Sequence, residues 1–252
     1  MLIAQLSDTH IQSASSDHPM AAARADNLRR SIADINRQGV DAVIHTGDSV
    51  QHGLAEEYAQ LREILGELEA PLFLIPGNRD RHEALKAAFG HFSYLPKDDD
   101  FLHYVVEDYP VRLIGLDTTA AGERKGAFCA ARRAWLEEAL AQRPDKPTLL
   151  FLHHPPFDIA EPRYVHGYCR PQEAEDLAAV VGRHPQVRGL FCGHVHFWHH
   201  ASWAGTTAVT MPSVAADLRI GTDAATDTAS LYFLHSVADD GTVVSRARIA
   251  AD

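Results

Sequence analysis

Five short clusters along this chain contain carboxylate, amide and imidazole side chains of the kinds that bind metal ions. They are Asp8-Thr9-His10, Gly47-Asp48, Gly77-Asn78-Arg79-Asp80, His153-His154-Pro155-Pro156 and Gly193-His194-Val195-His196. Oxygen and nitrogen donors dominate and no thiolate pair competes with them, which suits Mn²⁺, Fe or Zn²⁺. Two such ions side by side suit an in-line displacement at phosphorus. The residue types therefore point to phosphoester hydrolysis as the chemistry that such a site can perform.

Each cluster directly follows a short apolar run. The runs are LIAQLS, AVIHT, PLFLIP, TLLFL and VRGLFC. Runs of this length, rich in Leu, Ile, Val and Phe and bounded by Gly or Pro, predict buried strands. The candidate ligands therefore follow the carboxyl ends of successive strands, where open α/β sheets place their binding sites.

Taken singly, most of these residues also have a structural interpretation. Asp8 could cap the helix that follows it. Asp48 and Asn78 could each be a turn residue beside a glycine. His153 alone could be a hydrogen-bonded histidine of the core. The ordered occurrence of all five clusters, with two histidines on either side of one valine in the last, favours the metal interpretation.

These clusters, in this order and spacing, resemble the calcineurin-like metallophosphoesterase superfamily. Within it the chain is most similar to the class III cyclic-nucleotide phosphodiesterases and the bacterial glycerophosphodiesterases of the same branch. The stretches that carry the resemblance are IAQLSDTHI, GDSVQHGLAEEY, LFLIPGNRD, LFLHHPPF and LFCGHVH. The resemblance extends from the first strand to about residue 215 and is weaker beyond it.

The resemblance implies a fold, a cofactor and a set of ligands. The fold is an α/β four-layer αββα sandwich of two mixed sheets with helices on the outside. The cofactor is a pair of divalent or transition-metal ions, Mn, Fe, Zn or Co. The first ion takes Asp8, His10, Asp48 and His196, and the second takes Asp48, Asn78, His153 and His194. A hydroxide between the ions attacks phosphorus, and the chain forms a homodimer.

The third cluster departs from the pattern of this branch, which typically reads Gly-Asn-His-Asp where this chain has Arg79 as its third residue. The family histidine lies beside the phosphoryl group. Arginine keeps a permanent positive charge and can donate two hydrogen bonds to phosphoryl oxygens, but it cannot act as a general acid near neutral pH. We expect Arg79 to bind substrate and to share the catalytic role with Asn78. The alternative is that Arg79 turns away and pairs with Asp80 or another acid.

Three further residues are candidates for the reaction. His154 neighbours a predicted ligand, so it could orient that ligand in a catalytic role or could hydrogen-bond the backbone. Tyr164 and His166 lie in the polar stretch EPRYVHGYCR, from which they could reach the substrate. Two loops, 13–19 and 217–230, are placed to border the site.

The composition restricts the class of protein. A chain of 252 residues with 46% hydrophobic and 23% charged residues is typical of a soluble globular protein. A formal net charge of −11 argues against binding along a nucleic-acid polymer, which needs clustered Lys and Arg. The three cysteines form no Cys-x-x-Cys pair, and no apolar run is long enough to cross a membrane. We therefore expect a cytoplasmic protein that does not bind membranes.

Strand-like and helix-like segments alternate through the first 200 residues. Apolar spacing predicts helices over 21–38, 55–68, 82–89 and near 130–141, with another from 171. From about residue 198 the chain reads as short strands. No Pro/Gly/Ser-rich linker separates the parts, so we expect one domain over residues 1–252.

The leading hypothesis is a metal-dependent phosphoric diester hydrolase for small phosphodiesters of the glycerophosphodiester or cyclic-nucleotide type. The rivals among enzymes are a phosphomonoesterase and a nuclease of the same superfamily. A rival from a different class is a metal-free interaction scaffold, which the complete set of seven candidate ligands disfavours.

Overall fold

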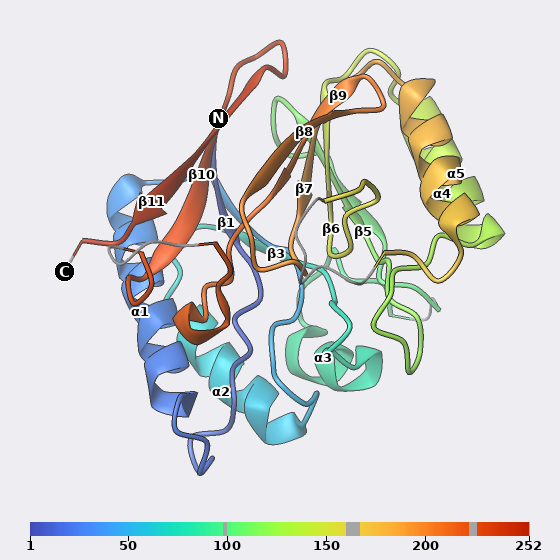
Figure 1. The fold of residues 1–252 in the computed structure, drawn as a ribbon. Coiled ribbons are helices and arrows are strands. Elements are labelled where there is room, and N and C mark those ends of the chain that lie inside the picture. The colour runs from blue at the N-terminus through green and yellow to red at the C-terminus, as the bar shows by residue number, and fades with distance from the viewer. Residues whose placement is uncertain (98–99, 160–166, 222–225, 252) are drawn as a thin grey trace.

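The computed structural model describes residues 1–97, 100–159, 167–221 and 226–251. Within this part of the chain two β-sheets lie face to face, and helices cover their outer faces (Figure 1). The predicted α/β sandwich of two mixed sheets is therefore confirmed. None of the described helices is both long enough and apolar enough to cross a membrane.

The first sheet has five strands in the order β11-β10-β1-β2-β3. Its parallel part consists of β1 (Leu2–Leu6), β2 (Ala42–His45) and β3 (Leu72–Leu74). Two antiparallel strands, β10 (Leu231–Val237) and β11 (Val243–Ile249), extend the sheet on the other side of β1. The last two strands of the chain thus complete the sheet that the first strand begins.

The second sheet has six strands in the order β4-β5-β6-β7-β9-β8. The strands are β4 (Tyr104–Val106), β5 (Arg112–Leu116), β6 (Thr148–Leu152), β7 (Val187–Cys192), β8 (His199–Trp203) and β9 (Thr206–Thr210). The four central strands are parallel, and β4 and β8 are antiparallel edge strands. Every residue of β5 and β6 is buried, which explains their continuous apolar sequences.

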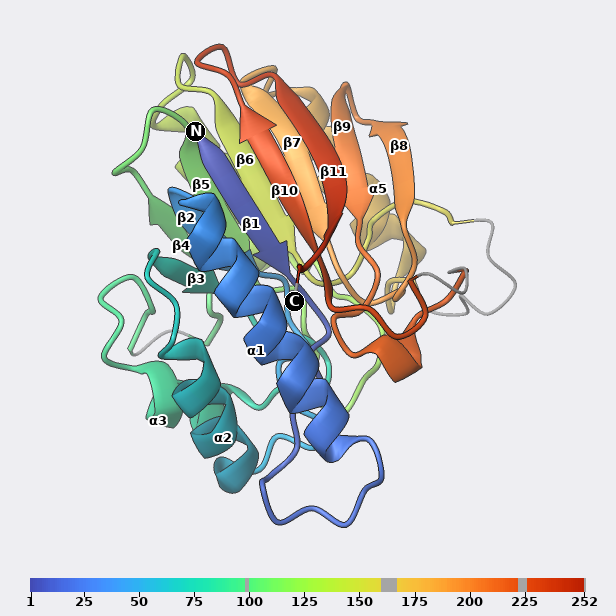
Figure 2. The ribbon, with the colours of Figure 1, turned by 90° about the vertical axis from the view of Figure 1, so that its left-hand side faces the viewer.

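The described helices are α1 (Ala21–Gln38), α2 (Ala55–Leu65), α3 (His82–Phe89), α4 (Ala130–Ala141) and α5 (Pro171–Gly182), with one 3₁₀ turn, η1 (Ala216–Leu218). Helix α1 lies on the outer side of the first sheet and runs beside β1 (Figure 2). Helices α4 and α5 lie together outside the second sheet (Figure 1).

Apolar spacing predicted α1, α3 and α4 at the bounds that the structure shows. Helix α2 ends at Leu65, three residues before the apolar repeat does, because Gly66 follows and glycine disfavours helix. The turn η1 lies at the start of the predicted 217–230 loop. Its position matters because the candidate ligand His196 donates a hydrogen bond to a carbonyl oxygen of this turn.

A buried hydrogen-bond network joins the two sheets. The amide of Gln5 on β1 donates to Thr46 Oγ1 at 2.9 Å and to the carbonyl oxygen of Cys192 on β7 at 3.1 Å. His235 Nε2 on β10 donates to Gln5 Oε1 at 3.0 Å, and Ser245 Oγ on β11 lies 2.8 Å from His235 Nδ1. Because buried polar groups are costly unless paired, this network fixes one relative placement of the sheets.

Candidate metal centre

The predicted ligands all follow strands whose carboxyl ends meet between the two sheets. The first sheet supplies Asp8, His10, Asp48 and Asn78 after β1, β2 and β3, and the second supplies His153, His194 and His196 after β6 and β7. Their donor atoms form three overlapping groups, and within each group the atoms lie within 4.8 Å of one another. The groups are Asp8, His10 and His196; Asp8, Asp48 and His153; and His153, His154 and His194. The structure therefore brings together residues up to 188 positions apart in the chain, since 196 − 8 = 188.

The backbone is strained where these ligands lie. Among the described residues other than glycine, positive φ angles occur at Asp8 (51°), His10 (44°), Asp48 (49°), His194 (73°) and His196 (55°), and otherwise only in the β8–β9 turn. L-residues rarely adopt this left-handed conformation, and such strain gathers at functional sites. Here it turns five predicted ligands into the space between the sheets.

Two glycines allow the loops after β2 and β3 to approach each other. A Cβ at Gly47, where φ is 89°, would lie 2.7 Å from the backbone nitrogen of Gly77. A Cβ at Gly77 would overlap the backbone nitrogen and carboxylate of Asp48. A side chain at Gly47 would collide with Gly77 and His153, and one at Gly77 would collide with Asp48, so both glycines keep the candidate ligands close together.

Hydrogen bonds on the far side of two imidazoles fix which ring nitrogen faces the centre. His196 Nδ1 donates to the carbonyl oxygen of Leu218 at 3.1 Å, and His10 Nδ1 donates to Gln51 Oε1 at 3.1 Å. In the neutral rings both Nε2 atoms then present lone pairs, yet they lie only 3.3 Å apart. His196 Nε2 also lies 3.2 Å from Asp8 Oδ1. Acceptors that converge in this way fit a cation bound among them.

The same arrangement recurs beside the second sheet. His153 Nδ1 donates to the carbonyl oxygen of Thr46 at 2.7 Å, so its Nε2 faces Asn78 Oδ1 at 3.3 Å and Asp48 Oδ1 at 3.5 Å. The other oxygen of Asp48, Oδ2, lies 3.7 Å from His10 Nε2. Oδ1 of Asp48 thus faces His153 and Oδ2 faces His10, so this carboxylate would be able to contribute one oxygen to each of two ions.

The pKa shifts of the clustered side chains show that this site favours positive charge. Burial opposes ionisation of Asp48, but the nearby His153 outweighs burial and holds the pKa of Asp48 well below its usual value. Burial favours neutral His153, but Asp48 overcomes it and raises the pKa of His153 to about 9. Asp8 likewise raises the pKa of His196 against burial, whereas burial lowers the pKa of His10 to about 4. Metal-free protein therefore takes up protons where cations would bind.

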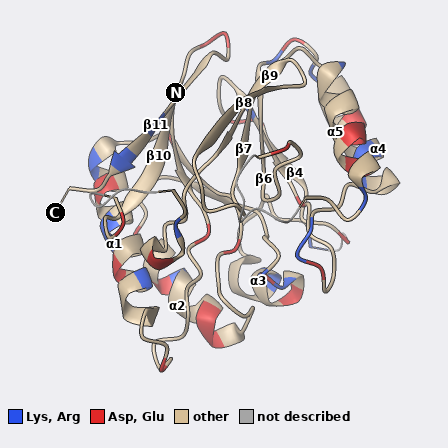
Figure 3. Ribbon diagram, in the orientation of Figure 1, with Lys and Arg blue, Asp and Glu red and all other residues tan. Residues whose placement is uncertain are grey.

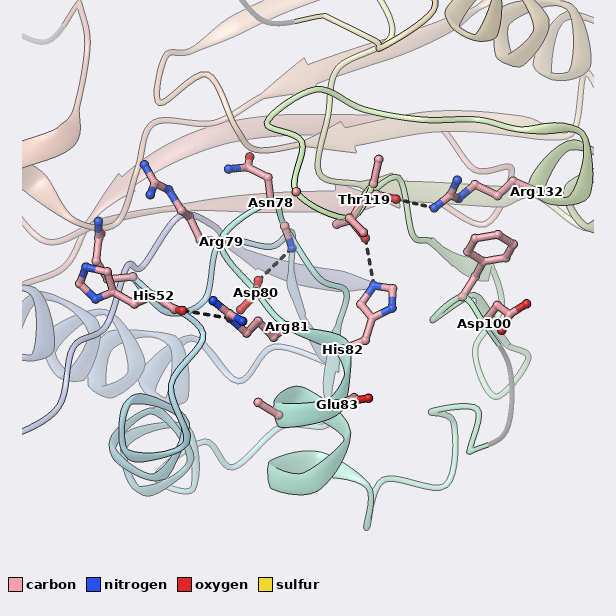
Figure 4. A pocket seen from close by; sticks show the side chains of 17 residues that line it. His52, Asn78, Arg79, Asp80, Arg81, His82, Glu83, Asp100, Thr119 and Arg132 are labelled. Atoms are coloured by element: carbon pink, nitrogen blue, oxygen red, sulfur yellow. Dashed lines mark hydrogen bonds between the residues drawn. The ribbon is translucent and has the colours of Figure 1, made fainter.

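Asp80 holds the third cluster in place. Its carboxylate accepts hydrogen bonds from the backbone nitrogens of Ser49 and Gly77 at 3.1 and 2.8 Å and from the hydroxyl group of Tyr58 at 2.8 Å. Arg79 donates its backbone N–H to Asp48 Oδ1 at 2.7 Å. Across the described ranges the Arg79 side chain makes no ion pair, and it points away from Asp80 (Figure 4). The alternative in which Arg79 pairs with Asp80 is therefore wrong.

Arg79 and Asn78 line one end of a cavity of about 1020 Å³. The cavity continues past His82 at the start of α3 to Thr119, Phe101 and Arg132 (Figure 4). Its placement beside the donor cluster makes it the candidate substrate site.

Sequence reasoning missed His82, a residue of the cavity wall, and its buried partner Asp117. His82 Nε2 lies 3.0 Å from Asp117 Oδ2 and 2.9 Å from Thr119 Oγ1. The hydrogen bond that His82 donates to Asp117 raises the pKa of His82 despite partial burial. The signal for it was present, because Asp117 ends the apolar run RLIGLD in the same way that the ligand clusters end theirs.

His154 is buried behind the cluster rather than in the cavity wall. Its Nδ1 lies 2.8 Å from Thr118 Oγ1, and its ring packs against those of His153 and His194 at centroid distances of 4.8 and 4.6 Å. Burial lowers the pKa of His154 to about 3, so the ring is neutral. Its catalytic role stays a prediction, and the predicted substrate residues Tyr164 and His166 lie outside the described residues.

Two facing sheets with a shared cluster of oxygen and nitrogen donors at their strand ends define a metal-dependent phosphoesterase. The family profile of the calcineurin-like phosphoesterases matches residues 1–197. The chain therefore belongs to the calcineurin-like phosphoesterase family.

Similar proteins agree with this assignment. The probable glycerophosphodiester phosphodiesterase GpdQ of Arcobacter nitrofigilis is 38% identical over 228 residues, which cover 87% of this chain and 82% of the relative. A probable cyclic nucleotide phosphodiesterase of Rhodopseudomonas palustris is 38% identical over 187 residues, covering 72% and 66% of the two chains. The crystal structure of a dimetal phosphatase from Danio rerio shares the fold with a TM-score of 0.74 at 14% identity, covering 100% of this chain and 97% of that one.

The position of Asp48 between the two donor groups predicts the effect of its loss. We expect Asp48→Asn to weaken metal binding at both positions, because an amide presents only one oxygen and carries no charge. Metal content per chain, measured after dialysis against a weak chelator, should fall from close to two ions toward none. A variant that keeps one ion at wild-type affinity would contradict the bridging role.

The raised pKa of His153 predicts a pH dependence of metal binding. In metal-free protein this ring keeps its proton up to about pH 9, so at lower pH an arriving ion must displace it. The apparent affinity should rise by roughly tenfold per pH unit or more from about pH 7 to about pH 9 and then level off. Competition with a chelating dye across this range measures the slope, and a flat profile would rule out proton displacement from the ligands.

Proposed function

We propose that this protein is a two-metal phosphodiesterase that hydrolyses small phosphodiesters of the glycerophosphodiester or cyclic-nucleotide type. The observation that carries the proposal is the pair of donor groups on either side of Asp48, with the cavity of about 1020 Å³ beside them. Relatives named as phosphodiesterases of these two types support the choice of diesters over monoesters.

The chain supplies two ligand sets that share one carboxylate. Following the resemblance, we assign Asp8, His10, Asp48 and His196 to the first metal position and Asp48, Asn78, His153 and His194 to the second. The close donor groups that contain most of these residues support the assignment. Bound there, two ions of Mn, Fe, Zn or Co supply Lewis acidity and lower the pKa of the attacking water. The protein's own contribution is to hold the donors rigidly and to aim neutral Nε2 atoms at each position.

Arg79 is the residue we assign to the substrate phosphoryl group. Its backbone is anchored to Asp48, while its guanidinium is free of ion pairs in the described structure and lies at the cavity wall. A guanidinium can donate two parallel hydrogen bonds to non-bridging oxygens and neutralise charge that develops on them. It cannot deliver a proton to the departing alkoxide, so the reaction depends on a leaving group that departs unassisted or is protonated by water.

The surface and cavity favour a small substrate over a polymer. Acidic and basic residues alternate along the outer helices, with no continuous basic stretch on the described elements in this view (Figure 3). The net charge of −11 also opposes phosphate-backbone binding. A homodimer remains part of the proposal by resemblance, and a cytoplasmic location and a single domain over residues 1–252 remain part of it on the sequence features alone.

The rival functions are separated by product assays. Purified protein loaded with Mn²⁺ should hydrolyse glycerophosphoethanolamine or a 3′,5′-cyclic nucleotide faster than the corresponding monoester and faster than single-stranded DNA. Faster hydrolysis of the monoester would favour the phosphomonoesterase, and cleavage of DNA alone would favour the nuclease. Metal-free protein that shows no activity after reloading would favour the scaffold.

Arg79 gives the sharpest prediction about catalysis. Arg79→Ala should slow diester hydrolysis, with a loss of up to about 3 kcal/mol for a charged hydrogen-bond donor. Because Arg79 holds its proton, wild-type protein should cleave aryl diesters much faster than alkyl ones. Arg79→His should flatten this dependence by placing a titratable group near the leaving oxygen.

The measurement is the slope of log rate against leaving-group pKa for a series of diesters in the three proteins. Arg81→Ala is the matched control, because Arg81 lines the same cavity and its guanidinium donates to the His52 carbonyl oxygen. Identical slopes and rates in wild type and both Arg79 variants would mean that the guanidinium does not meet the substrate.

A further inference from the structure

A segment near the end of the chain contacts two of the proposed ligands of the first metal position, His196 and Asp8. We call residues 213–220 the 213–220 segment. The carbonyl oxygen of Leu218 accepts His196 Nδ1 at 3.1 Å, and Ile220 donates its N–H to the His196 carbonyl oxygen at 3.0 Å. Ser213 Oγ donates to the carbonyl oxygen of Asp8 at 2.7 Å. This segment lies beyond residues 1–197, where the family profile matches.

An ion pair ties this segment to the remaining ligand. Arg24 on α1 is only 3% exposed and donates two hydrogen bonds to Asp217, from Nε at 3.0 Å and from Nη2 at 2.7 Å. Its Nη1 donates to the carbonyl oxygen of His10 at 3.2 Å and to Gln51 Oε1 at 3.0 Å. Gln51 Oε1 is also the acceptor for His10 Nδ1. The guanidinium of Arg24 therefore binds the backbone of His10, the Gln51 side chain that accepts from the His10 ring, and Asp217 in the 213–220 segment.

The second metal position is held by other means. His153 Nδ1 donates to Thr46, and Asn78 Oδ1 faces His153 Nε2. Neither side chain hydrogen-bonds the 213–220 segment in the part of the chain that the structure describes. The two positions therefore differ in their dependence on this segment.

We propose that the Arg24–Asp217 ion pair is a positioning device for the first metal position, setting the affinity of that position while leaving the second unchanged. The proposal rests on the ligand sets of the proposed function. A forked arginine–carboxylate pair fixes orientation as well as distance, and partners behind the ligands tune metal affinity. Without the ion pair, neither the guanidinium that donates to Gln51 nor the Leu218 carbonyl oxygen behind His196 is held in a fixed place.

Separate backgrounds isolate each metal position in the test. His153→Ala removes a ligand of the second position, so Co²⁺ titration of the metal-free protein reports the first. His10→Ala removes a ligand of the first position, so the titration reports the second. In the His153→Ala background, Asp217→Asn should weaken Co²⁺ binding by roughly 10- to 100-fold. In the His10→Ala background, it should change the dissociation constant by less than about threefold.

A second ion pair provides a matched control. Asp34 on α1 accepts a forked pair of hydrogen bonds from Arg248 on β11, so it also joins α1 to the end of the chain through a buried carboxylate. It lies away from the donor cluster. Asp34→Asn should lower the thermal unfolding midpoint and leave both Co²⁺ dissociation constants unchanged.

Asp217→Asn leaves Arg24 buried without its carboxylate, which can disturb folding by itself. The double variant Arg24→Gln/Asp217→Asn removes both charges and should show the same selective loss at the first position. The proposal would be overturned if Co²⁺ binding weakened equally at both positions or at neither. It would also be overturned if Asp34→Asn caused the same loss of Co²⁺ binding. Absence of Co²⁺ binding in both parent backgrounds would instead contradict the proposed function.

Discussion

The structure depends on the convergence of lone pairs at one point between the two sheets. The Nε2 atoms of His10 and His196 face each other at 3.3 Å, and Nε2 of His153 faces the oxygens of Asn78 and Asp48. Such groups repel one another unless positive charge lies among them. In metal-free protein protons supply it, as the raised pKa values of His153 and His196 show. Metal binding replaces these protons, which couples the site to pH.

The rest of the fold holds these donors close together despite their mutual repulsion and the strain of their backbone. Positive φ angles at five predicted ligands strain the backbone, and the surrounding structure must hold it. Buried parallel strands supply that rigidity, and the Gln5 network sets the spacing between the two sheets. Close contact of Gly47 with Gly77 then brings the loop carrying Asn78 against Asp48. The glycine that precedes Asp48 and the one that precedes Asn78 thus serve to hold these two candidate ligands together.

The sequence predicted the parts of the site that are local. Each candidate cluster follows an apolar strand, so Asp8, Asp48 and His153 were predicted as ligands from the sequence, and the structure brings them together. Helical periodicity predicted the bounds of α1, α3 and α4. Partners that meet only through tertiary packing were not predicted. Arg24 and Asp217 are 193 residues apart, and neither lies in a motif. The strand order β7-β9-β8 was also beyond reach, because alternating apolar residues specify a strand but not its neighbour.

The central claim is that two ions share Asp48, and electron paramagnetic resonance of the Mn²⁺-loaded protein tests it most directly. Two Mn²⁺ ions bridged by one carboxylate are coupled magnetically, so the account predicts the broad, temperature-dependent spectrum of an exchange-coupled pair. The spectrum should convert to that of isolated ions in Asp48→Ala. A wild-type spectrum of isolated Mn²⁺ at full occupancy, with two ions bound per chain, would contradict the account.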